Sequence, residues 1–254
     1  MMIESPQSFV VREECQKAAS QNGFRRILKE EAGWAAFGST TARGMVYLAA
    51  AGPSGPWYLA LDHSGVIEEL GLSAADVAGA GRARFAFDTL GALYNVLRRV
   101  YELGVSLPDA PLKEFEAKVA NLPRTTEAER LVVQRIGQDI FRDRLMDYWQ
   151  ARCPLTGISD PALLRASHII PWAECESDQS RLDVHNGLLL SALWDAAFDA
   201  GLVSFLDDGT PITSPRLSEP AATALGLHFD GKLSGLTDAH RANLAWHRSR
   251  YGFT

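Results

Sequence analysis

The chain has 254 residues, of which 46% are apolar and 22% charged, a balance that is ordinary for a globular protein of one or two domains. Its net charge of −6 argues against a protein that binds nucleic acid through bulk positive charge. No apolar stretch approaches the roughly 20 residues of a membrane span. Residues 1–14 mix charged and apolar side chains, unlike a secretory signal. We therefore expect a cytoplasmic protein with no membrane partner.

Three cysteines, Cys15, Cys153 and Cys175, are spread widely along the chain. Their odd number, and the lack of any Cys-x-x-C pair, argue against a disulfide scaffold and against a zinc site built from four cysteines. We therefore expect no structural zinc, and we interpret Cys153 as a small buried side chain.

The first 86 residues have the pattern of a mixed α+β fold. Short runs rich in aromatic and aliphatic residues predict strands at residues 34–37, 44–49 and 57–61. Glycine and proline at residues 52–56 mark a turn between the last two strands.

Helical periodicity begins after this region. Residues 88–103 carry apolar side chains at helical spacing, with Asp88 placed to cap the helix and Gly104 placed to end it. A shorter helix is predicted at residues 112–120.

Thr126 and Glu129 have the spacing of a capping box, which predicts the start of a long helix that reaches about residue 150. Beyond it the sequence changes to short strands, turns and compact helices. We therefore divide the chain into an N-terminal α+β domain over residues 1–122 and a second domain over residues 123–254, which begins with this helix.

The second domain contains a strand–strand–helix pattern. The segment around His168 predicts a strand that stops at Pro171. The pair Asn186 and Gly187, typical of a turn, precedes a second apolar strand. A short helix is predicted at residues 191–200, directly after that strand.

This pattern brings chemically useful side chains together. Asp195 and Asp199 are four residues apart, so both project from one face of the helix. Two carboxylates there favour a hard cation such as Mg²⁺ or Mn²⁺. A neutral imidazole nearby, here His168, can take a proton from water, and the amide of Asn186 can hold the imidazole or the turn.

Together these residues resemble HNH endonucleases of the ββα-metal superfamily, in the branch found among bacterial restriction enzymes. The resemblance covers about residues 125–254 and rests on the order and spacing of four short runs. They are residues 153–157, 167–172, 186–190 and 195–202.

The resemblance implies a C-terminal ββα-metal (HNH) nuclease domain, preceded by the α+β domain and a long linking helix. It implies hydrolysis of DNA phosphodiester bonds with a divalent metal, in a restriction or modification-dependent system. Since one such site cuts one strand, a homodimer is a hypothesis that accompanies it.

The resemblance also assigns residues. His168 matches the general base, and Asn186 matches the residue that orients the loop and the base, so these two form the expected catalytic pair. Asp195 stands where the family usually has its last metal ligand, a His or Asn, and Asp199 matches a second helix ligand that part of the superfamily has. Ser167 stands where many members have an Asp or His ligand, and is a departure because a hydroxyl is a poorer donor.

Three further side chains are candidate DNA contacts that fit a solvated surface equally well: Arg165, His185 and Arg248. His240 and His247 lie on the last predicted helix, residues 237–251, and we interpret them as structural.

Two alternatives to a restriction-type nuclease stay open. One is a non-catalytic protein that binds nucleic acid or a partner on an HNH scaffold, favoured by the acidic charge and by Ser167. The other is an HNH toxin. Residues 1–122 are a candidate for recognition of the DNA target, where aromatic side chains fit either a plain core or a pocket for a flipped base. These are Trp34, Phe37, Tyr47, Trp57 and Tyr58.

Overall fold

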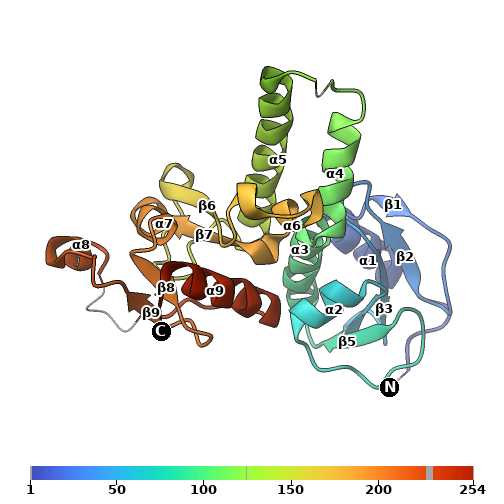
Figure 1. Ribbon diagram of the computed structural model, residues 1–254. Helices are drawn as coiled ribbons and strands as arrows, with labels where there is room; N and C mark the ends of the chain where they lie inside the picture. The colour runs from blue at the N-terminus through green and yellow to red at the C-terminus, as the bar shows by residue number, and fades with distance from the viewer. Residues whose placement is uncertain (1, 124, 227–230, 254) are drawn as a thin grey trace. The chain divides into compact units, whose positions relative to one another are not determined.

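The computed structural model describes residues 2–123, 125–226 and 231–253 (Figure 1). The chain divides into two compact units, Met1–Ala110 and Pro111–Thr254. Helices and strands are mixed in both, which confirms the expected α+β class. Helix α4 (Asp109–Val119), which the sequence placed before a boundary at residue 122, falls almost wholly in the second unit. None of the described helices has the length and apolar character that a membrane crossing requires.

The N-terminal unit is built on a five-stranded antiparallel sheet in which each strand pairs with the next one in the chain. Strand β4 matches the predicted residues 57–61, whereas β2 and β3 each begin one residue later than predicted. The sequence analysis did not anticipate β1, β5 or the short helix α2 (Ser64–Leu70). The strands are β1 (Arg26–Ile27), β2 (Ala35–Gly38), β3 (Met45–Ala50), β4 (Trp57–Leu61) and β5 (Ala83–Phe87).

Both faces of this sheet are covered, so β4 is buried along its whole length. Helices α1 (Phe9–Gln21) and α3 (Leu90–Ser106) pack against one face and against each other. The segment around Ala78 covers the other face, where Trp34 Nε1 donates to the Ala78 carbonyl at 3.3 Å. The five aromatic side chains considered for a flipped-base pocket are all buried, so they belong to the hydrophobic core of this unit.

Helix α3 corrects two expectations. Thr89, not Asp88, caps it, because the Thr89 hydroxyl accepts from the Ala92 amide at 3.2 Å. Gly104 does not end the helix but lies inside it, where its carbonyl accepts from the Arg43 amide at 2.8 Å. A Cβ at Gly104 would lie 3.1 Å from the Arg43 carbonyl oxygen, so this glycine permits a close approach of two chain segments.

The C-terminal unit begins with α4 and the long helix α5 (Glu127–Tyr148). The predicted capping box is present, since the Thr126 hydroxyl accepts from the Glu129 amide and the Glu129 carboxylate accepts from the Thr126 amide. These hydrogen bonds lower the pKa of Glu129. The helix ends before residue 150, because Gln150 and Ala151 adopt left-handed backbone conformations (φ 53° and 50°).

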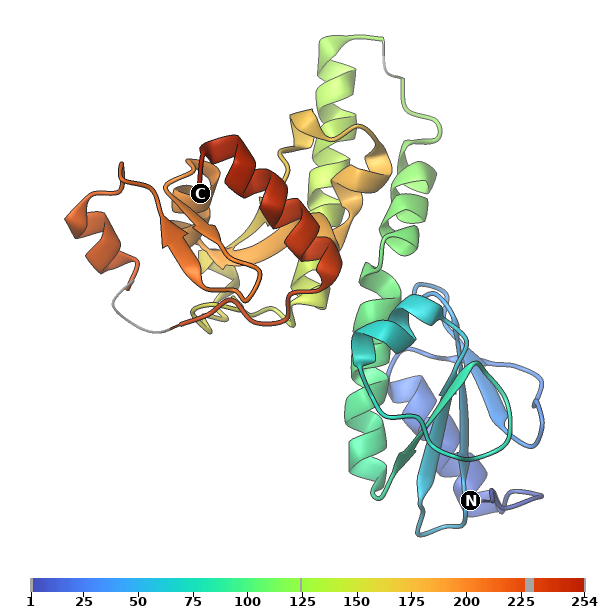
Figure 2. The same ribbon diagram turned by 60° about the horizontal axis from the view of Figure 1, so that its bottom comes forward.

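Strands β6 (Leu164–His168) and β7 (Gly187–Ser191) form an antiparallel pair, followed directly by helix α7 (Ala192–Asp199). This is the predicted strand–strand–helix order. Helix α5 packs against both strands (Figure 1). The remaining elements are α6 (Asp178–Leu182), β8 (Val203–Phe205), β9 (Pro211–Thr213), α8 (Glu219–Ala224) and α9 (Asp238–Tyr251). Helix α9 lies against β8 (Figure 2).

The predicted Asn-Gly turn is wrong. Asn186 ends a short 3-10 turn (Val184–Asn186), and Gly187 is extended with φ −149°. The connection between β6 and β7 is a long loop that contains α6. A β-hairpin turn of the Asn-Gly kind needs positive φ at both residues, which Gly187 does not adopt.

Candidate active site

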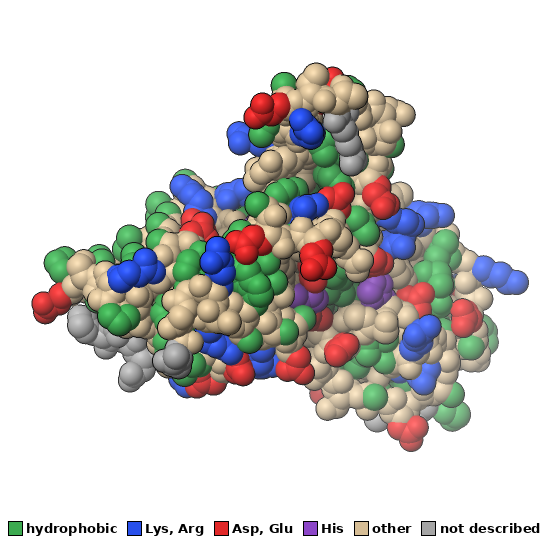
Figure 3. Space-filling model, viewed as in Figure 1, with side chains coloured by type: hydrophobic (Ala, Val, Ile, Leu, Met, Phe, Trp, Pro, Cys, Tyr) green, Lys and Arg blue, Asp and Glu red, His purple; other side chains and the backbone are tan. Residues whose placement is uncertain are grey.

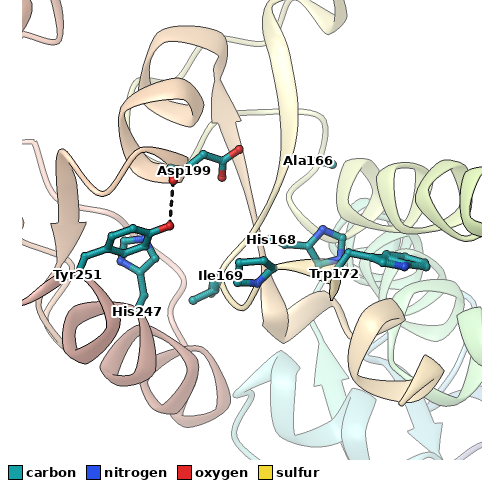
Figure 4. A pocket seen from close by; sticks show the side chains of 8 residues that line it. Ala166, His168, Ile169, Trp172, Asp199, His247 and Tyr251 are labelled. Atoms are coloured by element: carbon teal, nitrogen blue, oxygen red, sulfur yellow. Dashed lines mark hydrogen bonds between the residues drawn. The ribbon is translucent and has the colours of Figure 1, made fainter. Parts of the chain in front are cut away.

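Strand β6 directs two neighbouring side chains to opposite sides, as the alternation of a β-strand requires. Ser167 faces α7, where its hydroxyl donates to Asp199 Oδ1 at 3.3 Å. His168 faces α5, where its ring stacks on Phe141 with centroids 3.7 Å apart. In Figure 4 the ribbon of β6 passes between the Asp199 carboxylate and the His168 ring, which points toward Trp172.

The His168 imidazole is held by aromatic neighbours and by one hydrogen bond. Besides the stack on Phe141, the edge of Trp172 lies near it, with ring centroids 5.7 Å apart. His168 Nε2 lies 2.9 Å from the Arg181 carbonyl oxygen. Because a carbonyl only accepts, Nε2 carries the hydrogen and donates it. The neutral ring therefore has an unprotonated Nδ1, which has no hydrogen-bond partner among residues 2–123, 125–226 and 231–253.

Burial lowers the pKa of His168 from 6.5 to about 4, and the hydrogen bond to Arg181 opposes this only in part. A desolvated imidazole disfavours its charged form. His168 is therefore neutral at pH 7 and can accept a proton.

Asn186 braces the loop between β6 and β7 and is 3% exposed. Its Oδ1 accepts from the Ile170 amide at 2.8 Å. Its Nδ2 lies within hydrogen-bond distance of the Ile170 carbonyl, the Ser180 carbonyl and Cys175 Sγ. This amide thus joins both ends of the loop that follows His168.

Asp195 and Asp199 form an acidic pair on α7. Burial raises the pKa of each, and for Asp199 the neighbouring Asp195 charge raises it further. Ser167, which lies against both, opposes these shifts as a hydrogen-bond donor, and Arg165 opposes them at Asp195. The two carboxylates therefore repel one another in partly desolvated surroundings, a situation that a bound cation relieves.

The carboxylate side and the imidazole side meet at one cavity of about 360 Å³. His168, Trp172 and Asp199 line it, together with His247 and Tyr251 from α9 (Figure 4). No pattern in the sequence predicted that α9 reaches this cavity.

Helix α9 also fixes the C-terminal end of α7. The Tyr251 hydroxyl donates to the Asp199 carbonyl at 3.0 Å, and the Tyr251 ring lies so close to Gly201 that a Cβ there would be 2.1 Å from it. His247 is 2% exposed, as expected for a structural residue.

The oxygen donors on the α7 side fit a divalent cation. Mg²⁺ and Mn²⁺ take one or two carboxylates and complete their coordination with water and substrate phosphate. Asp195, Asp199 and the Ser167 hydroxyl offer such a set. In the part of the chain that the structure describes, no group of three or more His, Cys, Asp or Glu side chains is arranged to enclose a metal by itself.

The three side chains predicted to contact DNA differ in how far they are exposed to solvent. Arg165 is exposed and lies near the acidic pair. His185 is only 13% exposed, and its Nδ1 bonds Asp183 at 2.9 Å. Arg248 donates to the Phe205 carbonyl and to Asp207, which leaves its side chain 18% exposed. Of the three, only Arg165 presents its side chain at the surface.

The surface in Figure 3 shows basic and acidic side chains interspersed over the displayed face, in keeping with a net charge of −6. A site that recruits a polyanion on such a surface depends on local charge, which a bound divalent cation changes.

No curated protein matches the chain. Residues 153–206, which hold β6, β7, α7 and β8, match the family model described as HNH endonuclease. The resemblance seen in the sequence is therefore confirmed over this segment, and the match suggests nuclease activity in general.

Proposed function

We propose that the C-terminal unit is a divalent-metal-dependent DNA endonuclease of the restriction or modification-dependent type, with His168 as its general base. One observation carries this proposal. A neutral imidazole, whose Nδ1 has no hydrogen-bond partner among the residues that the structure describes, lines the same cavity as a carboxylate that belongs to an acidic pair. The match of residues 153–206 to HNH endonucleases supports it.

Each residue of the candidate active site then has a defined role in this reaction. His168 accepts the proton of the attacking water on Nδ1 while Nε2 stays bonded to the Arg181 carbonyl. Asp195, Asp199 and Ser167 would hold the cation, which would supply positive charge next to the phosphate and the leaving oxygen. Asn186 keeps the loop after His168 in place, and Arg165 is placed to contact a DNA phosphate.

The N-terminal unit has a separate proposed role. Phosphate contacts position a protein without selecting a sequence, so a nuclease site of this size needs help in choosing its target. We assign that help to the N-terminal unit. Since one such site cuts one strand at a time, we also propose a homodimer on DNA, which would cut both strands. A particle mass equal to one chain on a DNA duplex contradicts the dimer.

The test is cleavage of supercoiled plasmid with Mg²⁺ or Mn²⁺, using DNA with and without base modification. We expect nicking that stops on addition of EDTA and falls by about 10²–10⁴-fold in His168→Ala, the usual contribution of a general base. Cleavage that His168→Ala leaves intact contradicts the assignment of the base.

A non-catalytic scaffold is the second candidate, and Ser167 favours it because a hydroxyl replaces a stronger metal ligand there. Calorimetric titration with Mn²⁺ separates the two functions. The nuclease requires binding that is lost when Asp195 and Asp199 are both changed to Asn. A scaffold shows no such binding and no cleavage.

A further inference from the structure

Arg181, at the end of α6, holds the loop that follows His168. Its Nε donates to the Trp172 carbonyl at 3.2 Å, and its Nη2 donates to the Cys175 carbonyl at 2.8 Å. Its Nη1 donates to Asp178 Oδ1 at 2.9 Å. The guanidinium carbon also lies 5.8 Å from the Trp172 ring centroid. One side chain therefore fixes three points of the segment 172–181.

The backbone of the same residue touches His168. The Arg181 carbonyl accepts the hydrogen of His168 Nε2 at 2.9 Å. Trp172, whose carbonyl and ring both contact the guanidinium, also packs its edge against the His168 ring. Arg181 thus acts on two of the three groups that hold the imidazole, and Phe141 is the third.

We propose that Arg181 is a positioning residue for His168. Its guanidinium fixes the segment 172–181 so that its own carbonyl selects the Nε2–H tautomer and leaves Nδ1 as the proton acceptor. The catalytic consequence rests on the proposed nuclease function, whereas the choice of tautomer does not.

The hydrogen bonds explain why this role falls to the side chain of Arg181. Asn186 braces the same loop at Ile170, Cys175 and Ser180, and its amide does not reach the Trp172 carbonyl. Removing the guanidinium takes away the donors to the Trp172 and Cys175 carbonyls, and partly buried acceptors without a donor are costly. The loop then shifts to recruit water or other donors, and the Arg181 carbonyl shifts with it.

The experiment records long-range ¹H–¹⁵N spectra of the full-length chain, which distinguish the two ring nitrogens of His168. We expect the wild type to hold the Nε2–H tautomer. In Arg181→Ala we expect the Nδ1–H tautomer to appear, and kcat for plasmid cleavage to fall by about 10–100-fold, the usual effect of losing an orienting group. Mn²⁺ affinity should stay unchanged, because Asp195 and Asp199 lie on the other side of β6.

Arg142→Ala is the matched control. Arg142 also donates to two backbone carbonyls, Leu164 at 3.0 Å and Pro161 at 3.1 Å, but these lie at the start of β6, away from His168. This variant should lose stability and keep the wild-type tautomer. Arg181→Lys retains a cation but has a single donor nitrogen, which cannot reach all the guanidinium's acceptors at once. It should therefore restore part of the Nε2–H population, and it serves the same test if Arg181→Ala does not fold.

The outcomes are distinct. A wild-type tautomer in both Arg181 variants, or an equal change in Arg142→Ala, overturns the proposal. A wild-type protein that cleaves no DNA counts against the nuclease function, while the spectra still decide whether Arg181 sets the tautomer.

Discussion

Two histidines of the C-terminal unit, His168 and His247, have nearly the same surroundings. His168 stacks on Phe141 with ring centroids 3.7 Å apart, and His247 stacks on Phe198 at 3.8 Å. Each places Nε2 near a backbone carbonyl, that of Arg181 at 2.9 Å and that of Phe198 at 3.2 Å. Burial lowers the pKa of both to about 4.

The two rings differ at Nδ1. His247 Nδ1 lies 2.9 Å from the Ser204 hydroxyl, so both nitrogens of that ring are occupied. His168 Nδ1 has no such partner in the described parts of the chain, and its ring lines the cavity beside Asp199. Burial, stacking and a shifted pKa therefore do not distinguish a base from a structural histidine, whereas a free nitrogen beside a cavity does.

The largest expected effect is the difference between alanine substitutions at His168 and at His247. His168→Ala should lower cleavage by about 10²–10⁴-fold, the share of a general base. His247→Ala should instead act mainly on stability, by about 2–4 kcal/mol, because it leaves a cavity and removes the partner of the Ser204 hydroxyl. Urea unfolding and the cleavage rate per folded molecule measure the two effects.

Two results would contradict the assignment of His168 as the base and His247 as a structural residue. A His247→Ala protein that is folded but as inactive as His168→Ala would place His247 in the chemistry. A His168→Ala protein that loses stability and keeps its rate per folded molecule would make His168 structural.

The pH dependence of stability is the next largest effect. Between pH 6.5 and about 4 the unfolded chain takes up protons on both histidines, whereas the folded chain does not. The free energy of unfolding therefore falls as pH falls through this window, by about 3 kcal/mol for the buried His247. His168 acts in the same direction.

Urea titrations at pH 7 and pH 4.5 check this, with His247→Gln as the control. Glutamine does not titrate, so the variant should be less stable at pH 7 but should lose less stability on acidification. An equal loss in both proteins would mean that His247 titrates normally in the fold.

Gly187→Ala tests the stacking partner of His168. An added Cβ would lie 2.5 Å from Phe141 Cζ and 2.8 Å from Leu145 Cδ1, and both side chains are buried. Overpacking of this kind costs about 1–3 kcal/mol, and the displaced Phe141 ring should also disturb His168. Thermal unfolding and the cleavage rate should therefore fall together.

Gly91→Ala is the matched control, because a Cβ at Gly91 meets nothing within 4 Å and the position is helical. Alanine there should stabilise the protein by about 0.5–1 kcal/mol. A Gly187→Ala protein as stable as this control would show that Phe141 moves without cost.

Local patterns predicted the parts of the site that are close in sequence. The spacing of Asp195 and Asp199 sets them on one helical face, and Thr126 with Glu129 marks the start of α5. The Asn186–Gly187 pair wrongly predicted a hairpin turn, because an Asn-Gly pair can also lie at the end of a 3-10 turn. Here the buried Asn186 amide makes hydrogen bonds to the loop instead.

The remaining parts depend on contacts between distant segments. Phe141 and Tyr251 lie on helices before and after the strand pair, and amphipathic spacing shows that such residues face a core without showing which side chain they meet. Arginine is usually exposed to solvent, so the sequence gives no reason to place Arg181 at the site. Only the folded loop shows that the Arg181 carbonyl accepts a hydrogen bond from His168.

The smallest predicted effect is that of Asp199→Asn on the unfolding temperature, and its sign depends on whether metal is present. Like charges four residues apart on a helix cost about 0.2–0.5 kcal/mol, and Asp199 also ends α7, where the helix dipole disfavours a negative charge. In EDTA, Asp199→Asn should therefore raise the unfolding temperature slightly, whereas in Mn²⁺ it should be less stable than the wild type because it binds the ion more weakly. Asp160→Asn, at an exposed position with no capping bond, should show neither change. If Asp199→Asn has the same effect in EDTA and in Mn²⁺, the acidic pair on α7 is not where the cation binds, and the imidazole side of β6 would have to act without it.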